Sequence, residues 1–114
     1  MKYMLLINLG ERARDFQNLP EEERKQVGAG WGAINNTPGL TPGVRLAPPD
    51  AATTVRVEDG ETLTTDGPFV EIKEALGGYL FFEAEDLDAA IELAARIPAA
   101  SMGGAIEVRP LVER

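Results

Sequence analysis

Two short segments of the chain, residues 2–8 and 78–84, are apolar at nearly every position. Because successive side chains of a strand point to opposite faces, each segment would present apolar side chains on both faces. In the first segment, one face carries Tyr3, Leu5 and Ile7 and the other Met4 and Leu6. In the second, Tyr79 and Phe81 face one way and Leu80 and Phe82 the other. Both segments are predicted to be strands that are covered on both sides.

Two other segments repeat their apolar residues at helical spacing. The first opens at Pro20, continues with three glutamates in its first turn, and carries Val27, Trp31 and Ile34 on its apolar side. The second has Asp86 as its N-cap rather than as part of a metal pair, and Pro98 stops it. Its predicted apolar stripe consists of Leu87, Ala90, Ile91, Ala94 and Ile97. Residues 11–18 are polar and are expected to form a loop.

The remaining pattern adds a hairpin and two strands. Asp59-Gly60 separates the alternating segments TTVRVE and ETLTT, and a two-residue Asp-Gly loop favours a hairpin because both residues tolerate positive φ. Residues 44–48 form a short extended piece, and residues 104–112 a last strand with Ile106 and Val108 facing inward. The resulting order predicts a ferredoxin-like α+β sandwich with an inserted hairpin and helices on one face of an antiparallel sheet.

In such a sandwich the second face of the sheet has no cover within one chain. Met4, Leu6, Leu80 and Phe82, or the residues opposite to them, would form an exposed apolar patch there. A second sheet from another copy of the chain would cover that patch. We therefore expect a homodimer that is packed sheet to sheet.

The length, net charge and residue composition of the chain exclude several classes of partner and of chemistry. The 114 residues suit one domain, and the net charge of −8 argues against nucleic-acid and membrane partners. With neither cysteine nor histidine, the chain lacks thiolate catalysis, the usual general base and the commonest metal ligand, so no metal or cofactor is expected. The start of the chain reads as a first strand of a cytoplasmic protein rather than as a signal peptide.

The segment DGPFVEIKEALGGYLFFEAEDLDAAIELAARIP resembles the DGPF-motif branch of the YCII-related family. The resemblance extends to MKYMLLIN, LPEEER, APPDAATTVRVEDGETLTTDGPF and AIEVRPLVE, and so covers most of residues 1–114 as a single domain. It implies a bacterial protein with a dimeric α/β-barrel arrangement. Some related proteins are enzymes that act on small cyclic compounds through a His–Asp pair. This chain has no histidine for that pair, and INNTPGLTPGVRL is shorter than the corresponding region of the family.

Asp66, which opens the DGPF motif, has two interpretations. Its carboxylate can accept hydrogen bonds from the following backbone N–H groups and so organise a turn. Alternatively, it can be a proton acceptor in a cleft, since the 12 residues from Asp66 to Gly77 form a connection of a length that is often functional. Gly67 can adopt a backbone conformation that other residues resist.

The candidate ligand-binding residues are Lys73, Gly77, Gly78, Tyr79, Trp31 and Arg45. For most of them a structural interpretation stands beside the functional one: Lys73 can be part of a solvated loop, Gly77-Gly78 a bulge, and Trp31 a core residue. Two functions remain open. The first is a binding or accessory, regulatory module for a small molecule. The second is a cofactor-independent lyase or isomerase that moves a proton on a small cyclic substrate, with Asp66 as base.

Overall fold

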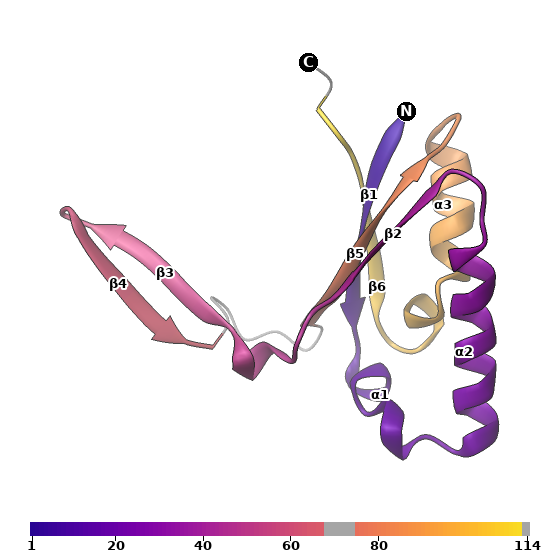
Figure 1. The fold of residues 1–114 in the computed structure, drawn as a ribbon, viewed down its shortest axis with the longest axis horizontal. Helices are drawn as coiled ribbons and strands as arrows, with labels where there is room; N and C mark the ends of the chain where they lie inside the picture. The colour runs from indigo at the N-terminus through magenta and orange to yellow at the C-terminus, as the bar shows by residue number, and fades with distance from the viewer. Residues whose placement is uncertain (68–74, 113–114) are drawn as a thin grey trace.

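The computed structural model describes residues 1–67 and 75–112, and Figure 1 shows their arrangement. An antiparallel four-stranded sheet forms the body, in the order β2-β5-β1-β6. Its strands are β1 (Lys2–Leu9), β2 (Leu40–Arg45), β5 (Ala75–Glu83) and β6 (Ala105–Pro110). The helices α2 (Glu21–Asn35) and α3 (Leu87–Arg96) lie on one side of the sheet (Figure 1). The predicted α+β architecture is confirmed, and it is consistent with a ferredoxin-like sandwich.

The core lies between this sheet and the two helices. Leu5 of β1 stands opposite Leu80 of β5 on one side and Val108 of β6 on the other. Leu5 and Leu80 are buried, and α2 and α3 contribute Ile34 and Leu93 to the same cluster. The strands are thus fixed by apolar burial on their helix-covered face, where a slip of one residue would expose every core side chain.

The other face of the sheet has no covering element among the described residues. Met4 stands opposite Phe81, and Leu6 opposite Tyr79. The Phe81 ring meets the Tyr79 ring edge to face at 5.9 Å, and the Lys2 Nζ lies 5.9 Å from the centre of the Phe81 ring. We call this the open face. The register of β1 on β5 places Tyr79 and Phe81 of β5 on the open face. Leu80 and Phe82 face the helices instead.

The inserted hairpin is present as predicted. It consists of β3 (Thr53–Glu58) and β4 (Glu61–Asp66), and it projects away from the sheet and helices (Figure 1). Asp59 and Gly60 both have positive φ, 50° and 79°, as a two-residue turn of this kind requires. The strength of this local signal explains why the hairpin was predicted with nearly correct ends.

The predicted N-cap of α3 is confirmed, but the face of the helix that is buried differs from the predicted one. The Asp86 carboxylate accepts a hydrogen bond from the Ala89 N–H at 2.9 Å. Of the predicted stripe, Ala90, Ala94 and Ile97 are buried, but Leu87 and Ile91 are 50% and 49% exposed. Leu93 is buried instead, because the helix turns a neighbouring stripe toward the sheet.

Two other expectations were wrong. Residues 11–18 do not form an irregular loop: they contain α1 (Glu11–Arg14) and a 3-10 turn (Phe16–Asn18). Strand β2 begins at Leu40, four residues before the predicted start, because its pairing with β5 overrides the breaker residues Pro42 and Gly43. Further 3-10 turns span Pro49–Ala51 and Pro98–Ser101. Among the described helices, none has the length and apolar character that crossing a membrane requires.

Candidate functional site

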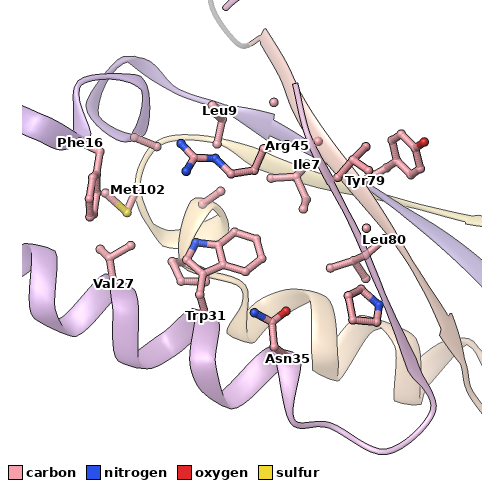
Figure 2. Close-up of a pocket in the computed structure, with 18 of the residues that line it drawn as sticks. Ile7, Leu9, Phe16, Val27, Trp31, Asn35, Arg45, Tyr79, Leu80 and Met102 are labelled. Carbon is pink, nitrogen blue, oxygen red and sulfur yellow. The ribbon is translucent and has the colours of Figure 1, made fainter. Parts of the chain in front are cut away.

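A pocket of about 450 Å³ lies on the helix-covered side of the sheet. Figure 2 shows it bounded by α2 on one side and by β1, β2 and β5 on the other. The short elements after β1 and after α3 supply further walls, through Phe16 and Met102. Its volume falls within the range of about 300–1,000 Å³ that is usual for small-molecule sites.

Helix α2 supplies one wall through residues spaced four apart. Val27, Trp31 and Asn35 share one face of the helix because four residues make slightly more than one turn. Trp31 is half-buried and packs against the core cluster, while its indole reaches into the pocket (Figure 2). Trp31 is therefore both a core residue and a pocket residue.

The sheet supplies the opposite wall through an irregular strand edge. Ile7 pairs with Gly78 and Asn8 with Leu76, so Gly77 is the extra residue of a bulge in β5. A Cβ at Gly77 would overlap the Leu9 side chain, and one at Gly78 would lie 2.5 Å from the Val44 carbonyl oxygen. The glycine pair thus has a structural role, the close approach of β1 and β2 to β5, at a position that also borders the pocket.

Arg45 enters the pocket from the end of β2. It stands opposite Gly78 in the register, on the helix-covered face of the sheet. Figure 2 shows its guanidinium reaching over the pocket near Leu9 and Trp31. Arg45 is exposed to solvent, so this charge lies in the accessible part of the site.

The described lining of the pocket is otherwise almost entirely uncharged and mainly apolar. Arg45 carries its one charged side chain, and Asn35 its one carboxamide. None of the described lining residues is an aspartate, a glutamate or a lysine. The arrangement is suited to hold an apolar body and to orient it by a small number of polar contacts.

Five of the residues selected from the sequence line this one pocket: Trp31, Arg45, Gly77, Gly78 and Tyr79. The ring of Tyr79 lies on the open face beside Phe81. Its phenol is therefore directed away from the pocket (Figure 2). Lys73 lies outside the described residues.

Asp66 is not among the described residues that line the pocket. It is exposed at the end of β4, opposite Thr53 in the projecting hairpin. The N–H of Gly67, the first one after Asp66, donates to the Ala52 carbonyl at 2.7 Å. The Thr54 hydroxyl donates to the Gly67 carbonyl at 2.8 Å, and Gly67 has a positive φ of 95°, a conformation that glycine adopts more readily than other residues. The rest of the DGPF motif, residues 68–69, lies outside the described residues.

Sequence reasoning missed several apolar lining residues, notably Phe16, Val27 as a pocket residue, and Met102. Phe16 falls in the segment that was expected to be a polar loop, where a single aromatic residue was the available signal. Met102 follows the 3-10 turn after α3, and nothing in the local pattern distinguishes it from a loop residue. Both reach the pocket through tertiary packing alone.

Comparisons with known proteins identify the family of the chain. The sequence model of the YCII-related domain matches residues 1–114. An uncharacterized protein of Rhizobium meliloti (strain 1021) is 39% identical over 102 residues, which cover 89% of this chain and 76% of that protein. The family match spans all four strands of the sheet, both long helices and the hairpin, and the chain therefore belongs to the YCII-related family.

Proposed function

We propose that this protein is a cytoplasmic bacterial homodimer of the DGPF branch that binds a small molecule in the pocket between α2 and the β2–β5 edge, as an accessory or regulatory module. The observation that carries the proposal is the pocket itself, with its apolar walls and few polar groups. The sequence predicts Trp31, Arg45, Gly77 and Gly78 as ligand-binding residues, and their convergence on the pocket supports the proposal.

The homodimer is supported by the open face. Met4, Leu6 and Phe81 form an apolar centre there, and charged residues lie around it: Lys2, Glu83, Glu107 and Arg109. An apolar centre with a polar rim is the usual anatomy of a protein interface. A second copy of the chain supplies a matching sheet, because a two-fold axis brings the same patch to both sides.

A cofactor-independent lyase or isomerase is less well supported. A general base must lie within hydrogen-bond reach of the proton that it removes. Asp66 is exposed on the hairpin and does not belong to the described lining, so at this pocket it is not placed as the base. Binding therefore needs fewer assumptions than catalysis.

Two glycines of α2 provide a test of the pocket. A Cβ at Gly28 or at Gly32 would meet no other atom within 4 Å, but only Gly28 is among the described lining residues. Gly28→Leu should place a side chain in the pocket, and Gly32→Leu should leave the pocket open. Both changes improve helix propensity, so neither is expected to unfold α2.

The measurement is binding from a library of small apolar molecules, followed by the fluorescence of Trp31, the one tryptophan of the chain. We expect wild type and Gly32→Leu to bind the same compounds and Gly28→Leu to bind them at least about tenfold more weakly. Equal binding by the two variants would contradict the assignment of this pocket.

A further inference from the structure

We propose that the ligand of this pocket is a monocarboxylate with an apolar body, and that Arg45 binds its carboxylate. This inference rests on the proposed function, the binding of a small molecule, and adds the chemical class of that molecule. It is carried by the position of one guanidinium in an otherwise uncharged pocket.

The charge distribution sets Arg45 apart. The chain has 19 acidic and 11 basic residues, so carboxylates are abundant, and two other arginines, Arg12 and Arg109, are paired with glutamates. Within the described part of the chain, Arg45 forms no ion pair, and no carboxylate lines the pocket around it. A cation placed beside apolar walls without a carboxylate is suited to an anion that arrives with the ligand.

The single positive charge of the pocket, carried by a guanidinium, favours a carboxylate over a phosphate as the anionic group of the ligand. A single guanidinium offers paired donors in the planar geometry that a carboxylate accepts, and it neutralises one negative charge. A phosphate monoester carries nearly two negative charges, and the overall charge of −8 would oppose it without a second cation in the pocket.

The rest of the pocket indicates the shape of the ligand. Trp31 and Phe16 provide flat aromatic surfaces, and Val27 and Met102 add apolar surface beside Phe16 (Figure 2). In Figure 2, Arg45 lies at the opposite side of the Trp31 indole from the backbone of α2, so a ligand held by its carboxylate would lay its apolar body along Trp31. Aromatic or aliphatic acids of modest size meet this description.

The test uses matched probes that differ in charge, 4-phenylbutyrate and 4-phenylbutyramide, with a second pair, octanoate and octanamide. Binding is followed by Trp31 fluorescence. We expect wild type to bind the acid of at least one pair about tenfold more tightly than its amide, on the scale of a charge-assisted hydrogen bond. Arg45→Met keeps an apolar stem but no charge, and should bring the acid down to the affinity of the amide.

Arg96→Met is the matched control, since Arg96 is an exposed arginine in the last turn of α3 outside the described lining. It lowers the net charge by the same amount as Arg45→Met and should keep the preference for the acid. Equal affinity of wild type for acid and amide would overturn the inference and leave the binding function intact. Loss of the preference in Arg96→Met would overturn it as well, because net charge would then be its cause. Failure of all four probes to bind wild type would overturn the inference, while the comparison of Gly28→Leu with Gly32→Leu decides the binding function separately.

Discussion

Gly43 of β2 and Tyr79 of β5 are in direct backbone contact: a Cβ on Gly43 would overlap the Tyr79 carbonyl group. The register of β2 on β5 shifts between Thr41 and Val44, and Gly43 lies within that irregularity. The contact brings the end of β2, with Arg45, against the sheet and so forms one edge of the pocket. Glycine is required here by space, because β5 occupies the volume that a side chain would need.

Gly43→Ala should therefore lower the free energy of unfolding. Moving β2 away from β5 to make room for a methyl group has the character of overpacking, which costs about 1–3 kcal/mol. Gly28→Ala is the control, because its Cβ would meet no atom within 4 Å and alanine favours the helix by up to about 1 kcal/mol. Urea unfolding of both variants would measure the difference. A Gly43→Ala protein as stable as wild type would show that β2 does not lie this close to β5.

The elements that the sequence predicted well are those whose signals are local. The hairpin is specified by Asp59-Gly60 and the start of α3 by Asp86, and in both cases a few neighbouring residues determine the backbone. Strand β2 differs, since Pro42 and Gly43 are breakers in any local reading. Its pairing with β5 decides the conformation there, and that partner is more than thirty residues away along the chain.

The residues of the candidate site likewise divide into those with a local sequence signal and those placed by packing between distant elements. Trp31 was predicted as either a core residue or a pocket wall, and Gly77-Gly78 as either a bulge or a point of close approach for a ligand, and all three border the pocket. Phe16 and Met102 come from short turns whose positions depend on packing between distant elements. Asp66 was selected from its motif, but the hairpin carries it to an exposed position.

The cap of α3 gives a second prediction. Asp86→Ala removes the acceptor of the Ala89 N–H and should lower the free energy of unfolding by about 0.5–2 kcal/mol. Asp88→Ala serves as the control, because Asp88 lies in the first turn and interacts mainly with the helix dipole, which contributes about 0.3–1 kcal/mol. Thermal and urea unfolding should rank Asp86→Ala as the more destabilised of the two. The reverse order would contradict the importance of the cap.

The open face gives a third prediction, which concerns the proposed homodimer. Phe81→Glu places a charge at the centre of the open face, next to Tyr79, and should convert the dimer to a monomer. Ile91→Glu makes the same kind of change on the outer side of α3, where Ile91 is already half exposed, and should leave the dimer intact. Sedimentation at several protein concentrations distinguishes the two. A wild-type protein that sediments as a folded monomer would refute the dimer.

Asp66→Asn gives the last prediction, in comparison with a change at the Thr54 hydroxyl, which lies on the neighbouring strand β3. Asp66 is exposed and the Gly67 N–H already donates to Ala52, so we expect a loss of stability of no more than about 0.5 kcal/mol. Thr54→Val, which removes the 2.8 Å bond to the Gly67 carbonyl, should cost about 1 kcal/mol.

Both variants should bind pocket ligands within about twofold of wild type, since neither residue is among the described residues that line the pocket. Urea unfolding and Trp31 fluorescence measure the two properties on the same samples. If Asp66→Asn were the less stable of the two variants, the carboxylate would be the organiser of the turn. If its stability matched wild type while turnover of a bound compound disappeared, Asp66 would be a base, because asparagine keeps the size of the side chain and loses only its ability to take a proton.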